Sequence, residues 1–172
     1  MNPANVRANT RSLLGLAAVS AAIAAVVTSH RPSPAAEPEP VWQPPAGYVV
    51  TDTVSLASAH TLRLWTGTSG WYVESLRSGR HEGAVGASSG SSDEYSASEI
   101  LDGLVGTVPV TGARAVSVGP PGAALRADLH AGVFLLPASA VPATDESVLV
   151  TPLDDAGRPL AAETAVPIAG RG

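Results

Sequence analysis

The sequence contains neither cysteine nor lysine. Without cysteine the chain has no disulfide framework, no thiolate metal site, no cysteine nucleophile and no lipid-modified cysteine anchor. A body of about 125 residues can bury a hydrophobic core without disulfides, so export from the cytoplasm stays open. All ten basic side chains are arginines, and glycine and proline are abundant, a composition typical of a GC-rich bacterial genome.

Positive charge is scarce beyond the N-terminus. Three arginines are the only charged side chains in the first 31 residues, and the remainder carries seven arginines against 15 acids, a net charge of −8. Nucleic acid and anionic lipid heads both attract positive surfaces, so an acidic body argues against either as its partner. We expect no nucleic-acid partner and find no cofactor motif.

Charge is absent from Ser12 to Ser29, a run that is apolar on every side. As a helix it is just long enough to cross a hydrocarbon core of about 30 Å. Arg7 and Arg11 precede it, so residues 1–11 should stay in the cytoplasm and the C-terminus should lie outside. We interpret residues 12–29 as a single-pass transmembrane helix. The alternatives are a cleaved signal peptide with Ala22-Ile23-Ala24 as an A-x-A match, giving a secreted chain, and a buried soluble helix.

Residues 30–47 form a predicted proline-rich linker. The stretch 32–45, "PSPAAEPEPVWQPP", has six prolines. It favours polyproline II and a semi-rigid spacer of roughly 40 Å, with a plain disordered linker as the alternative. Trp42 within it either docks on the body or lies exposed.

Residues 48–169 predict an all-β extracytoplasmic domain, a small immunoglobulin-like β-sandwich. Short β-rich runs alternate with Gly, Pro, Ser and Asp clusters every 8–12 residues. Strands are predicted over 48–54, 60–66 and 71–77. In the second, Leu62 and Leu64 share one face, and Arg63 and Trp65 share the other.

The middle of the body predicts less regular structure. Residues 80–104 read as a long Ser- and Gly-rich excursion. Ser96 and Glu99 fit a capping box, so a short helix is predicted near 97–104. No helical period follows residue 105.

The last third predicts strands only. Val116 and Val118 alternate with small residues, and in the next strand Leu125, Ala127 and Leu129 should face inward. The run "VFLLP" follows the turn at Ala131-Gly132. Finally a strand with Val148 and Val150, a turn at Asp154–Gly157 and a return strand from Arg158 predict a hairpin.

The strings "LRLWTGTSGWYVESL", "LVGTVPVTGARAVSV", "LRADLHAGVFLLPA" and "VLVTPLDDAGRPLA" occur in that order. Together they resemble small exported or membrane-tethered actinobacterial proteins of uncharacterised function with a C-terminal all-β domain. The resemblance covers about residues 60–160 and implies a compartment and a fold, without an activity. Such domains often carry a cysteine pair, whereas here Trp71 is followed by Tyr72.

One string suggests catalysis. "GASSG" fits G-x-S-x-G with Ser88 as nucleophile, and Asp102 or Asp128 and then His130 follow in the hydrolase order. That motif needs a strand-to-helix elbow in a doubly wound sheet, and this body lacks βαβ alternation. A solvated loop is the favoured interpretation.

Metal sites have weak support. There is no HExxH motif, although His60 and His130 stand at strand or turn ends where they could converge. Asp93, Glu94, Glu99 and Asp102 could offer oxygen ligands to Ca²⁺, but their spacing matches no EF-hand loop. We predict no metal site.

Aromatic residues give the one binding hypothesis. Trp65, Trp71 and Tyr72 lie on one predicted hairpin, where their faces could stack on sugar rings or on a partner's side chains. The competing interpretation is that they supply core in a chain with only seven aromatic residues.

These patterns favour an extracytoplasmic, non-catalytic binding module whose partner is a protein or a cell-wall polymer. The first alternative is the ectodomain of a membrane signalling or regulatory assembly, whose cytoplasmic part would have at most eleven residues. A small serine hydrolase that uses Ser88 ranks last.

Overall fold

The computed structural model describes residues 42–57, 59–88, 94–142 and 145–170, all of which belong to one unit, Val41–Gly172. Within them the chain forms eleven strands and a single-turn 3-10 helix, so the predicted all-β class is confirmed. No helix in these ranges is long and apolar enough to cross a membrane. The predicted span at 12–29 lies outside the described residues.

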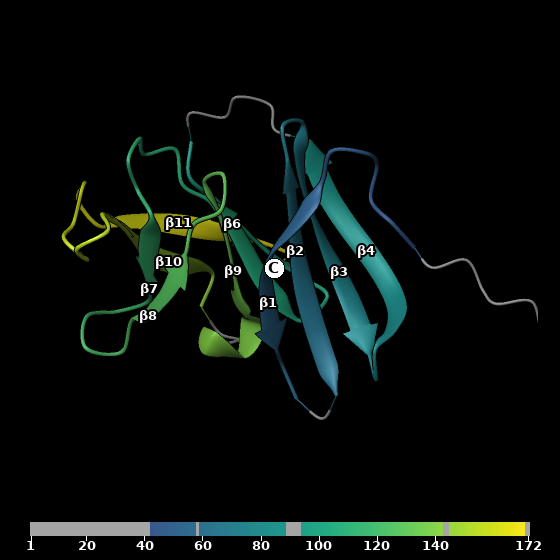
Figure 1. The fold of residues 1–172 in the computed structure, drawn as a ribbon. Helices are drawn as coiled ribbons and strands as arrows, with labels where there is room; N and C mark the ends of the chain where they lie inside the picture. Colours follow the sequence, from purple (N-terminus) through teal and green to yellow (C-terminus); the bar gives the residue numbers. More distant parts are fainter. Residues whose placement is uncertain (1–41, 58, 89–93, 143–144, 171–172) are drawn as a thin grey trace, which may run out of the picture. The chain divides into compact units, whose positions relative to one another are not determined.

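The first sheet is an antiparallel meander (Figure 1). Its strands, in chain and spatial order, are β1 (Val49–Ser55), β2 (His60–Gly67), β3 (Gly70–Arg77) and β4 (Arg80–Ser88). The hairpin predicted around Gly67–Gly70 is confirmed by its register, in which Trp65 lies opposite Tyr72.

The prediction of an irregular Ser- and Gly-rich segment over 80–104 is wrong for its first part, which forms strand β4. This strand pairs with β3 along its whole length, from Arg80 opposite Arg77 to Ser88 opposite Gly70. Small residues suit it because the neighbouring strand brings bulk: the Tyr72 ring lies directly over Gly86. The glycine and serine content therefore underestimates the tendency of this segment to form a strand, because the side chains that pack there come from the partner strand.

The second sheet has seven strands in the order β8-β7-β10-β11-β5-β6-β9. They are β5 (Ser96–Ile100), β6 (Gly103–Thr107), β7 (Ala115–Val118), β8 (Leu125–Asp128), β9 (Val133–Pro137), β10 (Ser147–Leu153) and β11 (Thr164–Ala169). Among these described strands only β11 and β5 pair in parallel. A 3-10 helix, η2 (Ala138–Ala140), follows β9. The edge strands β8 and β9 are joined by a short turn and lie close together, so the sheet curls.

The predicted helix near 97–104 is wrong. Strands β5 and β6 form a hairpin with a two-residue turn. The turn residues, Leu101 and Asp102, have φ angles of 52° and 65°. Ser96 does not cap a helix, because its hydroxyl bonds the Thr107 hydroxyl across the strands at 2.7 Å. Positive φ at both central positions defines a type I′ turn, which usually has the sequence Asn-Gly. Because this turn lacks Asn-Gly, the sequence gives no hairpin signal here.

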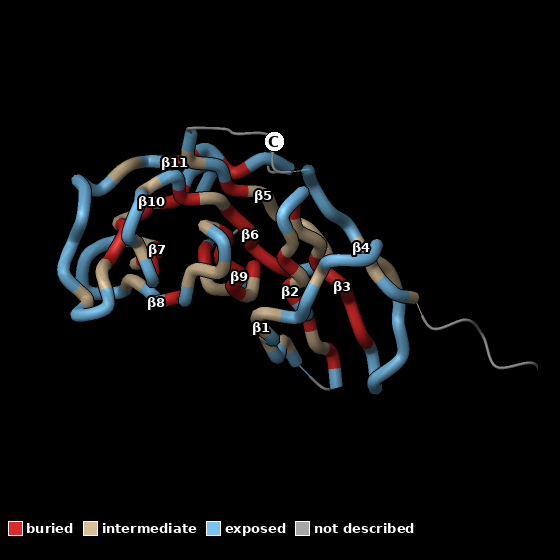
Figure 2. The backbone as a smooth tube through the Cα atoms, turned by 45° about the horizontal axis from the view of Figure 1, so that its top comes forward, coloured by how far each residue is buried: buried red, intermediate tan, exposed pale blue. Residues whose placement is uncertain are grey.

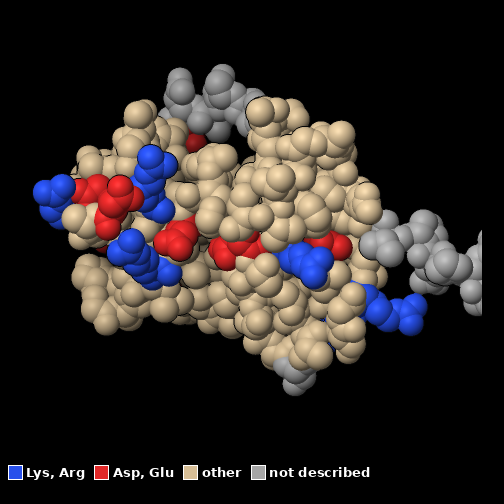
Figure 3. Space-filling view, viewed as in Figure 1, with Lys and Arg blue, Asp and Glu red and all other residues tan. Residues whose placement is uncertain are grey.

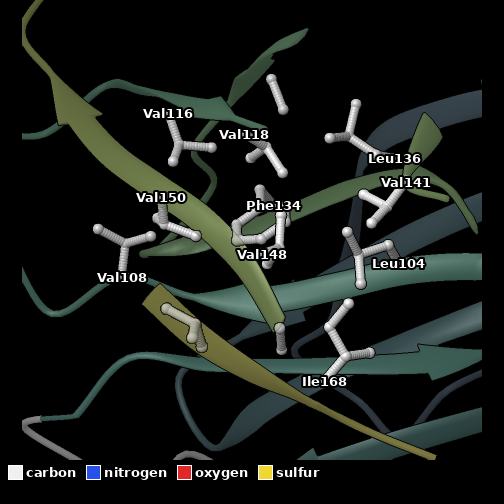
Figure 4. Packing of buried hydrophobic residues seen from close by; sticks show 13 residues of the cluster. Leu104, Val108, Val116, Val118, Phe134, Leu136, Val141, Val148, Val150 and Ile168 are labelled. Carbon is white, nitrogen blue, oxygen red and sulfur yellow. The ribbon is translucent and has the colours of Figure 1, made fainter. Parts of the chain in front are cut away.

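Two core clusters hold the unit together. The first lies among the strands of the second sheet, with the Phe134 ring inside it (Figure 4). The same ring lies over Gly106. The first cluster comprises Ala97, Leu104, Val108, Val116, Val118, Ala127, Phe134, Leu136, Val141, Val148, Val150, Val166 and Ile168. The second joins the two sheets and comprises Leu62, Leu64, Val73, Val105, Val133 and Leu135.

Strands β6 and β9 are buried on both faces (Figure 2). Leu104 and Phe134 point into the first cluster, whereas Val105 and Leu135 point into the second. Burial on both faces explains the unbroken apolar runs in the two sequences, because a strand with one solvent-exposed face alternates apolar and polar residues. The two sheets therefore pack through the outer side of β6 and β9.

Two details of the last third differ from expectation. Leu125 is 42% exposed, although Ala127 on the same strand is buried as predicted. No strand begins at Arg158: a single bridge joins Leu153 and Pro159, and β11 starts at Thr164. Asp154 accepts hydrogen bonds from the backbone N–H and from Nε of Arg158, both at 2.8 Å, which holds the chain in a turn there.

Candidate functional site

The outer face of the first sheet carries an aromatic group. Strand alternation buries Leu62 and Leu64 completely and turns Arg63 and Trp65 to the other side, as predicted. Tyr72 lies opposite Trp65 in the register, so its ring shares that outer face. Both rings are partly exposed.

The linker tryptophan docks on these rings. The Trp42 ring lies 6.1 Å from Trp65 and 6.1 Å from Tyr72, edge-on to both, and stacks on His81 at 5.1 Å. Tyr48 adds an edge contact to Tyr72 at 4.9 Å. We call Trp42, Tyr48, Trp65 and Tyr72 the aromatic face. None of the four belongs to either core cluster.

Trp71 lies apart from this group. It is the neighbour of Tyr72 on β3, so its side chain points to the opposite face of the sheet. There it packs, partly buried, against the second core cluster. The three aromatic residues that the sequence groups on one hairpin are thus divided, with two on the outer face and one toward the core.

A buried carboxylate lies beneath the aromatic face. Glu74 is only 3% exposed, and it accepts hydrogen bonds from Trp65 Nε1 at 3.0 Å and His81 Nδ1 at 3.1 Å. The Arg63 guanidinium lies 3.9 Å away. A buried charge is tolerated when it is paired in this way. Glu74 therefore orients both the Trp65 indole and the imidazole on which Trp42 stacks.

Sequence reasoning missed Glu74 and left the place of Trp42 open. The available signal was spacing, since Tyr72 and Glu74 stand two apart on a strand and must share a face. The contact with Trp42 carries no such signal, because it joins a proline-rich segment to strands 23 to 39 residues further along the chain.

Charged side chains are sparse on much of the surface. In the view of Figure 3 they form a narrow band in which arginines and acids are interspersed, with uncharged surface on either side. Ion pairs in the described residues include Arg114 with Asp155 and Arg158 with Asp154. That side of the molecule therefore presents no separate basic patch.

A pocket of about 520 Å³ brings together three residues that the sequence analysis considered separately, His60, Glu99 and Asp102. His60 starts β2, Glu99 lies on β5, and Asp102 is in the β5–β6 turn. The apolar wall comes from the β1–β2 turn and from the segment around η2, and consists of Leu56, Ala57, Ala138, Val141 and Pro142.

His60 joins this pocket to a serine and a second acid. Its Nε2 lies 2.9 Å from the Ser75 hydroxyl, which donates to Glu82 Oε2 at 3.3 Å. The pKa of Glu82 is lowered, chiefly by the hydrogen bond from Arg77, so this carboxylate is an acceptor. With the Ser75 hydroxyl donating to Glu82, the serine oxygen is left to accept Nε2–H of His60, which assigns the tautomer with a proton on Nε2.

This arrangement resembles a Ser-His-Asp triad in its order of contacts, with Asp102 Oδ2 at 3.9 Å from His60 Nδ1. In a catalytic triad the imidazole accepts the serine hydroxyl proton as a general base. Here His60 Nε2 carries the proton and donates it to the Ser75 oxygen instead. Ser75 is also only 4% exposed and does not line the pocket. The hydrogen bonds of this group link β2, β3 and β4 within the first sheet, and His60 presents an imidazole to the pocket.

The other catalytic candidates lie apart. Ser88 ends the edge strand β4, Asp128 lies on β8, and His130 stands in the β8–β9 turn, where its backbone bridges Val133. No hydrogen bond or ion pair joins these three side chains in the described ranges. Nor does any group of three or more His, Asp or Glu there converge closely enough to hold a metal ion. Asp93 lies outside those ranges.

Comparison with known proteins adds no family to this description: no protein-family profile, curated protein or solved structure matches the chain.

Proposed function

We propose that this chain is an extracytoplasmic, non-catalytic binding module, held at the cell surface by the helix predicted over residues 12–29. The observation that carries the proposal is the aromatic face. Four of the seven aromatic side chains gather there, outside both core clusters, while only Phe134 is fully buried. All four rings are partly exposed, and aromatic side chains that reach the surface without belonging to the core are typical of a binding site.

The partner class proposed is a cell-wall polymer or a protein. Flat indole and phenol rings stack on sugar rings and on apolar side chains alike, and their polar tips tolerate water. The docked Trp42 supports a surface role, because it brings the linker and the binding face together on one side of the sheet.

The architecture suits this role. We place the unit among small β-sandwiches that resemble immunoglobulin domains in having two packed sheets, although its first sheet is a meander where those domains have Greek-key connections. We also assign it to the small exported actinobacterial proteins that its sequence resembles.

Sedimentation with isolated cell walls tests the proposal. The full chain in mild detergent should co-sediment with walls, and Trp65→Leu or Tyr72→Leu should weaken binding about tenfold or more, as loss of a central aromatic contact does. Binding to walls stripped of protein identifies the polymer as partner, and binding only to untreated walls identifies a wall protein.

Leu125→Ala is the matched control, since Leu125 is an exposed apolar residue on the second sheet. Thermal melts run in parallel distinguish lost binding from lost folding. Folded Trp65→Leu and Tyr72→Leu variants that bind as the wild type does would refute the proposal.

A further inference from the structure

The pocket at His60 has the features of a ligand site distinct from the aromatic face. His60 shares the inner side of β2 with Leu62 and Leu64, whereas Trp65 is on the outer side, so the two lie on opposite faces of the sheet. A pocket of 520 Å³ is within the range that small ligands occupy.

Backbone hydrogen bonds fix both walls of the pocket. On one side Leu56 N–H donates to His60 O at 2.9 Å and His60 N–H donates to Ala57 O at 2.8 Å. On the other, Ala138 N–H donates to Asp102 O at 2.9 Å, which ties η2 to the β5–β6 turn. Leu101 packs against the second core cluster and anchors that turn. The pocket is therefore preformed.

The protonation of His60 defines what the pocket offers. Because Nε2–H donates to Ser75, neutral His60 has an unprotonated Nδ1 with a free lone pair. His60 is 8% exposed, yet no fully enclosed side-chain nitrogen or oxygen among the described residues lacks a partner. Among the described residues no hydrogen bond to Nδ1 is found, and Nδ1 faces Asp102 Oδ2 at 3.9 Å in the pocket that both residues line.

The polar side chains that line the pocket are His60, Glu99, Asp102 and Ser139; Nδ1 and the carboxylates accept, and the Ser139 hydroxyl can donate or accept. Nδ1 and Asp102 Oδ2 are 3.9 Å apart, too far for a direct hydrogen bond. One donor nitrogen about 2.8–3.0 Å from each atom spans that gap. Glu99 adds a second carboxylate to the lining, and the apolar wall is suited to an alkyl stem.

We propose that this pocket binds a primary alkylammonium group, with the ammonium between His60 Nδ1 and Asp102 and the alkyl stem on the wall formed by Leu56, Ala57 and Val141. An ammonium supplies three donors and a positive charge, which matches two acceptors and a carboxylate. The group comes either from a free amine or from a lysine side chain of a polypeptide.

Titration of the ¹⁵N-labelled full chain in mild detergent by n-butylammonium chloride tests the proposal. We expect saturable shifts of the amide signals of Leu56, Ala57 and Ala138. Two matched probes should leave these signals unchanged: n-butanol keeps the stem without the charge, and tetramethylammonium keeps the charge without N–H donors. Equal shifts from either probe, or no saturable response to butylammonium, would overturn the proposal.

Two variants locate the site. Asp102→Asn should weaken butylammonium binding about threefold to fivefold, because the charge of a carboxylate whose side chain is 78% exposed is lost, while Asp128→Asn on β8 should bind as the wild type does. Ala57→Phe keeps every polar group and fills the stem space, so it should abolish binding even if Asp102→Asn misfolds. Unchanged binding in folded Asp102→Asn or Ala57→Phe would contradict the assignment.

The source of the amine is read from a second titration with the blocked peptide acetyl-Gly-Lys-Gly-amide. Binding about tenfold tighter than that of butylammonium identifies a lysine side chain, because flanking backbone adds contacts. Equal or weaker binding identifies a free amine. Both results support an alkylammonium site.

Discussion

Gly86 shows how one small residue supports the aromatic face. A Cβ there would collide with the Tyr72 ring and lie 2.5 Å from the Trp71 carbonyl oxygen, which is backbone and cannot move aside. Gly86→Ala should therefore lower the free energy of unfolding by about 1–3 kcal/mol, the usual cost of overpacking. Urea unfolding measures it.

Gly83 on the same strand is the matched control, because a Cβ there meets nothing within 4 Å. Gly83→Ala should change stability by about 0.5 kcal/mol or less. Equal effects of the two substitutions would mean that Tyr72 does not lie on Gly86.

The hydrogen bonds of Asp154 in the turn to Arg158 make the free energy of unfolding depend on pH in the acid range. The pKa of Asp154 is held below the ordinary 3.8, first by the backbone N–H of Arg158 and then by the Arg158 side chain. A lowered carboxyl pKa stabilises the folded state above the unfolded-state value, and this contribution is lost as pH falls through the folded-state value. Asp154→Asn should thus destabilise the protein at neutral pH, and the difference from wild type should shrink as the pH falls below 3.8.

Urea unfolding at a series of pH values checks this. Asp155→Asn is the control, since Asp155 is its exposed neighbour and lies 4.0 Å from Arg114. A wild-type-to-Asp154→Asn difference that stays constant from neutral to acid pH would be inconsistent with the depressed pKa.

At the level of elements, the β5–β6 hairpin is held in a turn that its own residues disfavour. Leu101 and Asp102 both adopt left-handed backbone, which costs a residue with a Cβ about 1–2 kcal/mol relative to glycine. Asp102→Gly and Asp102→Ala remove the same carboxylate, but only glycine relieves the backbone. Asp102→Gly should therefore be more stable than Asp102→Ala by about 1 kcal/mol. Equal thermal midpoints would show that the turn is not left-handed at this residue.

The same turn shows where sequence patterns fail. Residues 96–104 have apolar spacing and a Ser-x-x-Glu string, Ser96 to Glu99, that satisfy the rule for a helix start, yet Ala97 and Leu104 are buried as strand residues. The segment forms strand β5 because it pairs with β6 and β11. Strand β11 is distant in the sequence, and the unusual turn hides the pairing with β6. The β2–β3 hairpin was predictable because its own alternation and glycines specify it locally.

At the level of the molecule, the sequence predicts the class of fold and part of the outer-face chemistry. It assigns Trp65, Trp71 and Tyr72 to one hairpin, and strand alternation separates Trp71 from Tyr72, but which of the two faces is the outer one depends on how the sheets pack. It raises His60, Glu99 and Asp102 for separate reasons, and only the packing of β2 against the β5–β6 turn collects them in one pocket. Contacts between sheets depend on tertiary register, which periodicity within one strand does not encode.

The central claim is that the aromatic face binds a partner outside the cell. Photo-cross-linking in intact cells tests it most directly, with the full chain carrying p-benzoylphenylalanine either in place of Tyr48 on that face or in place of Leu125 on β8. We predict that position 48 gives an adduct with a wall fragment or an exported protein and that position 125 gives none. An adduct of position 48 with a cytosolic protein, or identical results from both positions, would contradict the account.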